Sequence, residues 1–411
     1  MKKEQNKSLA KKSKTSKGFD SITSQDRFDK EIKVFPHTLP IYTTSTFIYE
    51  SPEIAQQIFG RKVDGYAYSR FSHPNAQLVE EKLEKMETFG LDIKAKALIF
   101  STGMTAISNL FQSLLRPGDC VIAQGNIYGT SVDFFTHFTE VYKMEVVYAD
   151  FKNADEIEGL LKTKKNVKLL YAETPSNPTI SCYDLNMLSK LAAKYKVKFA
   201  VDSTFASPYL QQPLKYGADF VIHSATKYLN GHGTALGGIL IGRDYEFMNT
   251  KVWKNRKITG GICSAFDSWQ LNNGMKTLSL RMDKHSSNSL AIAKYLQTHP
   301  AVKEVHYLGL KDHPDHALAK KQMKNFGGVL AFDLKNGYKA GDKLMKKIKF
   351  CHLTASLGTI DTLLQHPASM SHSFVSKEQR LKFGITDGLV RMSVGIENVE
   401  DIIADLEQAL K

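Results

Sequence analysis

Short apolar segments alternate with longer amphipathic segments through the middle of the chain. Seven apolar runs of five to seven residues are rich in β-branched and aromatic side chains; they lie at 96–100, 119–123, 144–149, 167–173, 197–202, 219–223 and 238–242. Runs that are apolar at consecutive positions are typical of strands buried on both faces. We therefore expect a mostly parallel, seven-stranded sheet covered by helices on both sides.

The segments between these runs have apolar residues at helical spacing. Residues 105–115, 156–165 and 185–196 show this pattern, and each segment connects one apolar run to the next. A strand followed by a helix and a further strand, repeated along the chain, indicates a doubly wound α/β domain.

The two ends of the chain break this pattern. Residues 1–72 have little periodicity, so we expect an N-terminal arm that is disordered, above all over residues 1–18, or laid over a partner subunit. Toward the C-terminus, helix-like and strand-like segments end on an amphipathic helix at 399–411. Residues 279–411 are predicted to form a smaller α+β domain, which leaves 73–278 as the central domain.

Composition is that of an ordinary globular protein, with 42% hydrophobic and 24% charged residues. No apolar run reaches the ~18 residues of a membrane-spanning helix, and the N-terminus lacks the apolar segment of a secretory signal. The four cysteines are scattered without a paired spacing, which disfavours a metal cluster or a disulfide framework. We expect a cytoplasmic protein that uses no metal and contacts no membrane.

Positive charge gathers at the N-terminus, where seven lysines and one glutamate in residues 1–18 supply +6 of the net charge of +13. Basic segments of this kind bind nucleic acid or anionic membranes in some proteins. Because no basic stripe interleaved with aromatic residues accompanies it, we favour a solvated tail, with nucleic-acid binding as the alternative. We expect no nucleic-acid partner.

Polar segments follow four of the expected strands. They are STGM at 101–104, ETPSNP at 173–178, VDSTFASP at 201–208 and HSATK at 223–227. Ligands of open α/β sheets bind at the carboxyl ends of the strands, so we expect these segments to line one pocket.

Three residues in these segments suit one cofactor. Gly103, between a strand and a helix, permits a phosphate seat at the helix N-terminus, although an ordinary turn has the same pattern. Asp202, at the end of a buried strand, suits a cationic heterocycle nitrogen or a helix cap. Lys227, among hydroxyl groups, suits a Schiff base with an aldehyde. Together they match pyridoxal 5′-phosphate (PLP), and the missing G-x-G-x-x-G spacing disfavours NAD.

From about residue 35 onward, the chain resembles the PLP-dependent Cys/Met metabolism (trans-sulfuration) family. The resemblance rests on YAYSRFSHPN, STGM, ETPSNP, VDSTFASP, HSATKYLNGHG, SLGTIDTLLQHPASMSH and GLVRMSVGIE, which occur in the family's order. It implies an aspartate-aminotransferase-like fold (fold type I) and a homotetramer built as a dimer of dimers. It also implies γ-elimination of a sulfur amino acid, most closely that of L-methionine to methanethiol, ammonia and 2-oxobutanoate. The alternatives are γ-replacement, as in cystathionine synthesis or O-acylhomoserine sulfhydrylation, and cystathionine cleavage.

The resemblance implies roles for the residues that match the family's motifs. Lys227 is expected to form the Schiff base with PLP and Asp202 to pair with the pyridine nitrogen. Tyr128 is expected to stack on the ring and to act as a general acid. The other expected cofactor-binding residues are Asn177 near the ring hydroxyl and, around the phosphate, Gly103, Met104, Ser224 and Thr226.

Two further pairs of residues have implied roles. Tyr68 and Arg70, in the arm, are expected to complete the phosphate site of the neighbouring subunit, which makes the enzyme at least a dimer. Arg391, helped by Ser356, is expected to bind the carboxylate of the amino-acid substrate, a task that suits the forked guanidinium group.

A few positions bear on the choice of substrate. Thr130 stands where methionine-directed members have a cysteine, which weighs against methionine. Ala355 and Ala67 stand where cystathionine-directed members have glutamates, and Asp133 stands where cystathionine γ-lyases tend to have arginine. The distal charged groups of cystathionine would thus lose their partners, and the balance favours a γ-lyase that acts on methionine.

Overall fold

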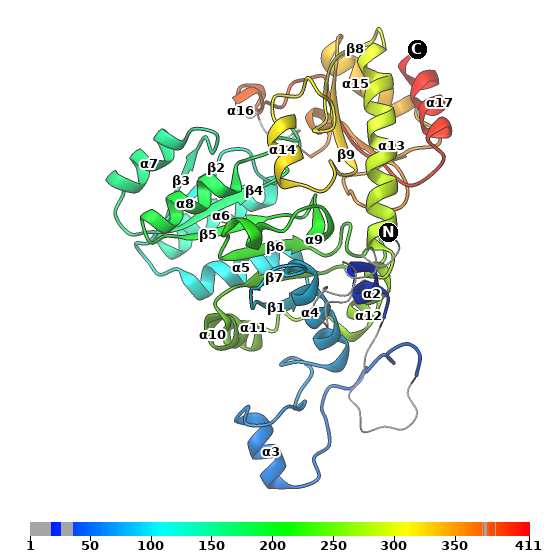
Figure 1. Cartoon of the computed structure of the whole chain (residues 1–411). Coiled ribbons are helices and arrows are strands. Elements are labelled where there is room, and N and C mark those ends of the chain that lie inside the picture. The colour runs from blue at the N-terminus through cyan, green and yellow to red at the C-terminus, as the bar shows by residue number, and fades with distance from the viewer. Residues whose placement is uncertain (1–17, 26–35, 372, 374–375, 383) are drawn as a thin grey trace, which may run out of the picture.

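The computed structural model describes residues 18–25, 36–371, 373, 376–382 and 384–411. Two sheets organise the molecule, one of seven strands and one of five, and the chain passes from the first to the second along the long helix α13 (Leu278–Thr298) (Figure 1). The predicted combination of a large α/β part and a smaller α+β part is confirmed. The boundary positions proposed from the sequence stay predictions.

The seven apolar runs form the seven strands of the large sheet, each within one residue of its predicted ends. The strands are β1 (Lys96–Phe100), β2 (Cys120–Gln124), β3 (Glu145–Ala149), β4 (Val167–Glu173), β5 (Lys198–Asp202), β6 (Phe220–Ser224) and β7 (Gly238–Gly242). Their order is β1-β7-β6-β5-β4-β2-β3. Strand β7 is antiparallel to both of its neighbours, whereas the other neighbouring strands pair in parallel. The mostly parallel sheet is confirmed, and the reversed β7 was not predicted.

Helices cover both faces of the large sheet because its strands are apolar on both (Figure 1). Along β5, Phe199 and Val201 belong to one buried cluster, and Ala200, which points to the opposite face, belongs to another. The surrounding helices are α4 (Pro74–Glu87), α5 (Gly103–Leu114), α6 (Gly129–Tyr142), α7 (Ala154–Thr163), α8 (Leu185–Lys194), α9 (Ser207–Leu210), α10 (Tyr245–Phe247), α11 (Trp253–Thr259) and α12 (Ala265–Met275). The three helices predicted from periodicity are α5, α7 and α8.

The small sheet packs against α13 and carries its own core. Its strands are β8 (Val302–His306), β9 (Val329–Leu334), β10 (His352–Leu353), β11 (Leu363–Gln365) and β12 (Leu389–Ser393), in the order β10-β11-β12-β9-β8. Alternate residues of β9 and β12, namely Leu330, Phe332, Val390 and Met392, share a buried cluster with Ile292 of α13. The helices that follow α13 in the described part of the chain are α14 (His316–Gln322), α15 (Gly337–Lys347), α16 (Lys377–Lys382) and α17 (Val399–Leu410).

In the described part of the N-terminal arm, the chain forms two short helices that the sequence pattern did not predict, α2 (Phe19–Ser24) and α3 (Pro52–Phe59). Helix α2 is anchored by the ring of Phe19, which meets the rings of Phe89 and Tyr209. The segment predicted to be disordered, 1–18, lies outside the described residues apart from Gly18.

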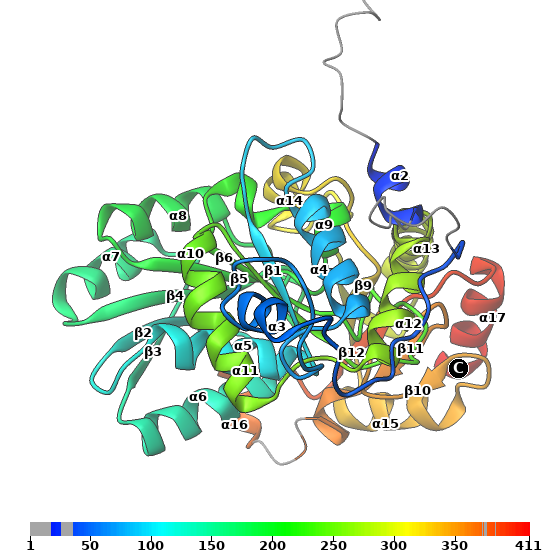
Figure 2. The ribbon, with the colours of Figure 1, turned by 90° about the horizontal axis from the view of Figure 1, so that it is seen from below.

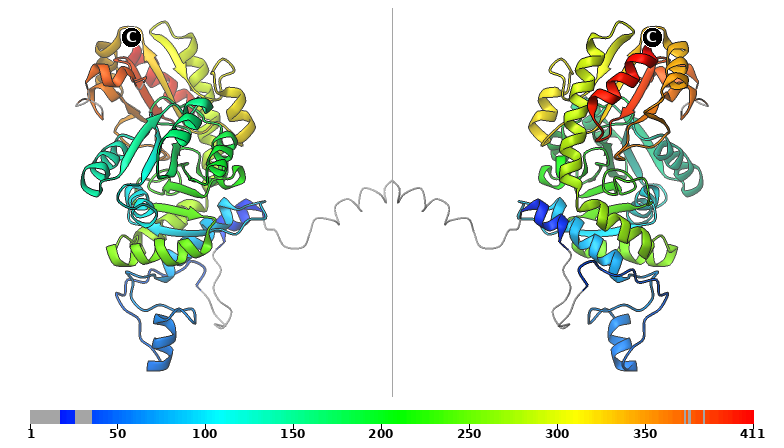
Figure 3. Two further views of the ribbon diagram at one scale, coloured as in Figure 1. Left: turned by 90° about the vertical axis from the view of Figure 1, so that its left-hand side faces the viewer. Right: turned by 90° about the vertical axis from the view of Figure 1, so that its right-hand side faces the viewer.

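Helix α3 protrudes from the body in both side views (Figure 3). Seen from below, it lies beneath α4 and α11 (Figure 2), and residues of all three helices line one cavity. Next to α3, the Arg61 guanidinium lies 4.4 Å from the ring centre of Trp253, which ties the arm to α11. Within the part of the chain that the structure describes, no helix has the length and apolar character needed to cross a membrane.

Candidate active site

A cavity of about 240 Å³ lies at the carboxyl ends of β4, β5 and β6. Its wall is formed by the residues that follow these strands, by the first turns of α5 and by part of β12 from the small sheet. Nine of the predicted site residues line it: Gly103, Met104, Tyr128, Asn177, Asp202, Ser224, Thr226, Lys227 and Arg391. The expectation that the polar strand ends share one pocket therefore agrees with the structure.

Lys227 follows β6 and contributes its amine to the cavity wall. Its Nζ donates a hydrogen bond to Ser356 Oγ at 2.9 Å. Burial, and after it the nearby Arg391 guanidinium, lowers the pKa of Lys227 to about 8. An amine with such a pKa is partly unprotonated near neutral pH, so it can act as a nucleophile and as a base.

Asp202 ends β5 and is buried in the cavity wall. Its Oδ1 accepts hydrogen bonds from the Thr204 amide at 3.0 Å and from the Thr204 hydroxyl at 2.6 Å. Burial outweighs these bonds and raises the pKa of Asp202. The alternative role as a helix cap is wrong, because the N-cap position of the next helix, α9, is Ala206. A carboxylate held in this way is best compensated by a cation in the cavity.

The N-terminus of α5 provides an anion seat. The first amides of a helix have no partner within it, and those of Gly103 and Met104 belong to residues of the cavity wall. A Cβ at Gly103 would come within 3.0 Å of the Ser224 Cβ, so glycine lets α5 begin this close to β6. The hydroxyl groups of Ser224 and Thr226 complete a set of donors at the positive end of the helix.

Arg391 enters the cavity from the small sheet. It lies between Val390 and Met392 on β12, whose side chains face the core, so its own side chain points the other way. The guanidinium donates to Asn177 Oδ1 at 3.0 Å and to the Ser356 carbonyl at 2.7 Å. Its Nε has no hydrogen-bond partner among the described residues, which leaves a donor for a bound carboxylate. Ser356 thus accepts hydrogen bonds from both Lys227 and Arg391.

Tyr128 stands at the N-terminus of α6, and 47% of its surface is exposed. Its amide donates a hydrogen bond to Glu173 Oε2 at 2.8 Å. Glu173 ends β4, lines the same cavity and pairs in register with Asp202 of β5, yet the sequence analysis assigned it no role. The signal that pointed to Asp202, a carboxylate at the end of a buried strand, also applies to Glu173.

Three predicted site residues are not part of the wall of this cavity, and one of them, Ser356, still contacts Lys227 and Arg391 there. Tyr68 and Arg70 are in the arm, where the Arg70 guanidinium contacts the Lys257 carbonyl and lies 5.4 Å from the centre of the Tyr68 ring. Tyr68 is exposed. The structure describes one chain, so the contribution of both residues to a neighbouring subunit stays a prediction.

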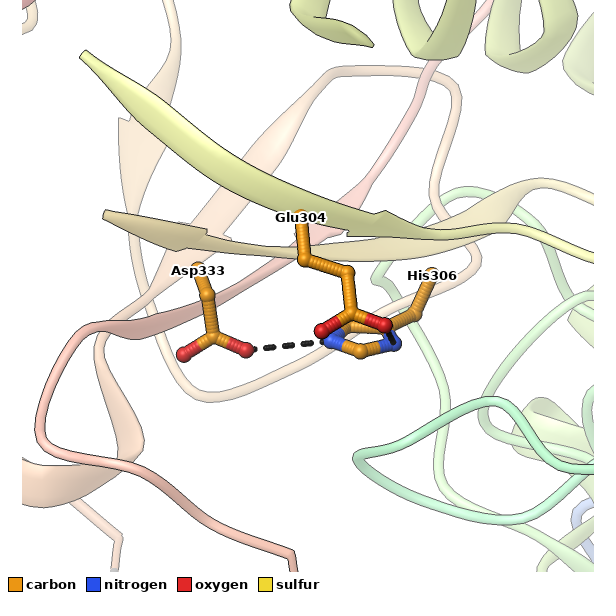
Figure 4. Close-up of side chains that lie close together, drawn as sticks. All are labelled: Glu304, His306 and Asp333. Carbon is orange, nitrogen blue, oxygen red and sulfur yellow. Dashed lines mark hydrogen bonds and ion pairs between the residues drawn. The ribbon is translucent and has the colours of Figure 1, made fainter. Parts of the chain in front are cut away.

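A larger cavity, of about 560 Å³, is lined by polar residues that include Glu304 and His306, and by none of the predicted site residues. Figure 4 shows these two side chains of β8 with Asp333 of β9. His306 Nε2 lies 3.0 Å from Asp333 Oδ2, and its Nδ1 lies 3.9 Å from Glu304 Oε1. An imidazole set between two carboxylates accounts for this cluster without a metal ion, so we assign it no part in the active site.

A mostly parallel sheet with one reversed strand and a lysine-bearing cavity at its carboxyl edge places the chain among the fold type I PLP-dependent enzymes. Comparison with known families is more specific. The Cys/Met metabolism PLP-dependent enzyme family matches residues 21–411, so the chain belongs to this family and the predicted membership is confirmed.

Several relatives are similar over nearly the whole chain. L-methionine gamma-lyase of Fusobacterium nucleatum subsp. polymorphum is 43% identical over 374 residues, which cover 91% of this chain and 93% of that protein. Cystathionine gamma-lyase of Bacillus subtilis is 37% identical and covers 91% of this chain and 94% of that protein. The crystal structure of cystathionine gamma synthase from Xanthomonas oryzae pv. oryzae in complex with cystathionine has a TM-score of 0.89 at 34% identity, with 96% of this chain and 98% of that chain covered. The chain is therefore a PLP-dependent lyase of this family, whose members are named for different substrates.

The cavity suits the family's cofactor. Gly103 lets the N-terminus of α5, which favours a phosphate group, lie close to Ser224 at the end of β6. The buried carboxyl of Asp202 matches a cationic ring nitrogen, and the amine of Lys227 has a pKa low enough to react with an aldehyde. PLP is thus the cofactor of this enzyme, and these residues are the ones suited to hold it.

Proposed function

We propose that this protein eliminates the γ-substituent of L-methionine, with methanethiol, ammonia and 2-oxobutanoate as products. The observation that carries the proposal is the apolar part of the cavity wall, formed by Met104, Ile107, Phe205, Leu236, Ala355 and Leu357. A neutral thioether suits such a wall. The distal ammonium and carboxylate of cystathionine would be desolvated there without partners.

Two positions refine this argument. Ala355 lines the cavity at the place where cystathionine-directed members have a glutamate, so a partner for a distal ammonium group is missing from that position. Thr130 is exposed on the first turn of α6 and lies outside the group of residues that line the cavity. We therefore expect that its difference from cysteine does not exclude methionine.

When bound, PLP supplies an aldehyde and a ring that accepts the electrons released at the α- and β-carbons of the substrate. Lys227 Nζ removes and returns the protons of these carbons, for which a pKa of about 8 is suitable. Asp202 balances the charge of the ring nitrogen. Arg391 binds the substrate carboxylate, and the Tyr128 hydroxyl gives the proton that leaves with the sulfur.

A product assay on the purified, PLP-loaded protein tests this proposal. Methionine is supplied alone and, in parallel, O-acetyl- or O-succinylhomoserine is supplied with cysteine. We expect methanethiol, ammonia and 2-oxobutanoate from methionine. Cystathionine from the second mixture, with methionine left intact, would assign γ-replacement instead. The Lys227→Ala variant is the control and should lose both turnover and the visible absorption band that PLP acquires on Lys227.

We also propose a homotetramer, built as a dimer of dimers, in which Tyr68 and Arg70 of one subunit complete the phosphate site of the next. In support, the arm presents apolar side chains to solvent: Ile48 is 100% exposed and Phe59 is 58% exposed. Co-expression of Lys227→Ala chains with Arg70→Ala chains tests the shared site. Each variant alone should be nearly inactive, and randomly mixed dimers should recover about a quarter of the wild-type activity. Mixtures no more active than their components would contradict a site shared between subunits.

A further inference from the structure

Glu173 joins two loops of the active site. It is 5% exposed at the end of β4, and its two carboxylate oxygens accept hydrogen bonds from two different segments. Oε2 accepts from the Tyr128 amide at 2.8 Å, and Oε1 accepts from the Asn177 amide at 2.8 Å. The first amide belongs to the loop that enters α6, and the second belongs to the loop that follows β4. One side chain therefore sets the distance between these loops.

The backbone of Glu173 is fixed as well. Its amide donates to Gln124 Oε1 at 3.0 Å, and the Gln124 side-chain amide in turn contacts the Asn126 carbonyl. Gln124 ends β2 and is buried. The ends of two neighbouring strands and the loop that leads to Tyr128 thus form one buried hydrogen-bond network.

The chemistry of the two contacts requires a carboxylate. Both partners are backbone N–H groups, so each oxygen of Glu173 must act as an acceptor. A glutamine of the same shape would turn its NH₂ group toward one of these amides, and a protonated carboxyl would turn its hydroxyl toward it. Either change leaves one of the two loops without its anchor.

The anchored residues act at opposite ends of the substrate. Tyr128 is the proposed acid for the leaving group, and Asn177 accepts a hydrogen bond from Arg391, the proposed carboxylate clamp. We infer that Glu173 is a positioning residue that holds Tyr128 and, through Asn177, Arg391 in the arrangement that the elimination requires. This inference rests on the function proposed above for the same site.

The test compares Glu173→Ala and Glu173→Gln with Glu84→Gln. Glu84 is the matched control because its Oε1 also accepts a backbone hydrogen bond, from Ala97 at 3.0 Å, but it lies outside the cavity wall. The first measurement is amide hydrogen exchange of the protein without PLP. Exchange at both Tyr128 and Asn177 should accelerate in Glu173→Ala, exchange at one of these two amides should accelerate in Glu173→Gln, and both should stay at the wild-type rate in Glu84→Gln.

The second measurement is turnover of the PLP-loaded variants. We expect kcat to fall about tenfold to a hundredfold in Glu173→Gln, because the acid is misplaced, and KM to rise because the clamp is loosened. Glu84→Gln should stay within about twofold of the wild type. Glu173→Asp keeps the charge on a shorter side chain, so its kcat should lie between those of the wild type and Glu173→Ala. If the alanine variant does not fold, Glu173→Asp takes its place in the comparison.

Unchanged exchange at both amides in a folded Glu173→Ala protein would overturn the inference. An equal loss of turnover in Glu84→Gln would overturn it too, since the effect would then be a general loss of stability. The exchange measurement needs neither substrate nor cofactor. If the wild-type protein does not turn over methionine, the proposed substrate is wrong, but the exchange measurement still tests the positioning role of Glu173.

Discussion

Two pairs of acidic residues face each other across neighbouring strands, one in each sheet. Glu173 of β4 is paired in register with Asp202 of β5, and Glu304 of β8 is paired in register with Asp333 of β9. Carboxylates at directly opposite positions repel each other, so each pair needs compensation. The two sheets supply it in different ways.

In the small sheet, the compensation comes from the chain itself. Glu304 is 63% exposed in its side chain, and His306 lies between the two carboxylates (Figure 4). Water and salt weaken the remaining repulsion. The pair is thus satisfied without any bound molecule, and its cavity is lined by groups that pair with one another, such as Gln297 and Asp312.

In the large sheet, the compensation is incomplete. Glu173 and Asp202 are both buried, and burial raises the pKa of both. Backbone amides and Thr204 supply hydrogen bonds, and the cations Lys227 and Arg391 line the same cavity, where burial lowers the pKa of each. A cationic ring nitrogen beside Asp202 would compensate the buried negative charge that the fold leaves without a full set of partners. The comparison teaches that the site which keeps unbalanced charge is the one built to receive a ligand.

The largest expected effect comes from removing the buried charge. Asp202→Asn should lower kcat with methionine about 10²- to 10³-fold, because the partner of the ring nitrogen loses its charge in a buried site. The matched change in the other pair, Asp333→Asn, should leave kcat within about twofold of the wild type. Steady-state kinetics and the dissociation constant of PLP measure both variants. A comparable loss of turnover in the two variants would show that the pairs do not differ in function.

A buried histidine extends the comparison to stability. His285 is fully buried beside Tyr228, and burial lowers its pKa to about 4, whereas the ordinary value is 6.5. Between these values the unfolded chain binds the additional proton, so the free energy of unfolding should rise with pH across this window. The contribution of His285 should reach up to about 3 kcal/mol.

Urea unfolding at a fixed protomer concentration, repeated between pH 4 and pH 6.5, measures this contribution. His285→Gln should flatten the rise with pH, and Lys284→Gln, an exposed change on the same helix, should keep it. An equal slope in the wild type and His285→Gln would contradict the assignment of the effect to this side chain.

A smaller effect concerns the amine of Lys227. The rate at which PLP reacts with the apoprotein should rise with pH and reach half of its maximum near pH 8, because the unprotonated amine is the nucleophile. Arg391→Met should move this midpoint upward, since the repulsion from Arg391 disappears while burial, the larger cause, remains. Stopped-flow absorbance of the PLP band follows the reaction. A midpoint that does not move in Arg391→Met would show that Arg391 does not lower the pKa of the Lys227 amine.

The sequence predicted the parts of this site that have a local signal. Lys227, Asp202 and Gly103 could be found because each follows an apolar strand, and the carboxyl ends of parallel strands meet at one edge. The role of Glu173 could not be predicted, because its partners are backbone amides in loops that approach only in the folded chain. The reversed β7 gave no signal either, since an apolar run has the same pattern in both directions.

The smallest effect is expected at Glu304, the exposed member of the pair formed with Asp333 in the small sheet. Glu304→Gln removes a repulsion against Asp333 and, at the same time, a weak attraction to His306 at 3.9 Å, so the two changes nearly cancel. The free energy of unfolding should change by less than about 0.5 kcal/mol, and added salt should reduce even this difference. Asp333→Asn should cost more, about 1–3 kcal/mol, because Asp333 is buried, lies 3.0 Å from His306 and accepts a hydrogen bond from Thr386. Urea unfolding at low and high salt measures both variants. A loss above about 1 kcal/mol in Glu304→Gln that salt does not reduce would mean that this pair is not self-compensated, and the contrast with the buried pair would lose its basis.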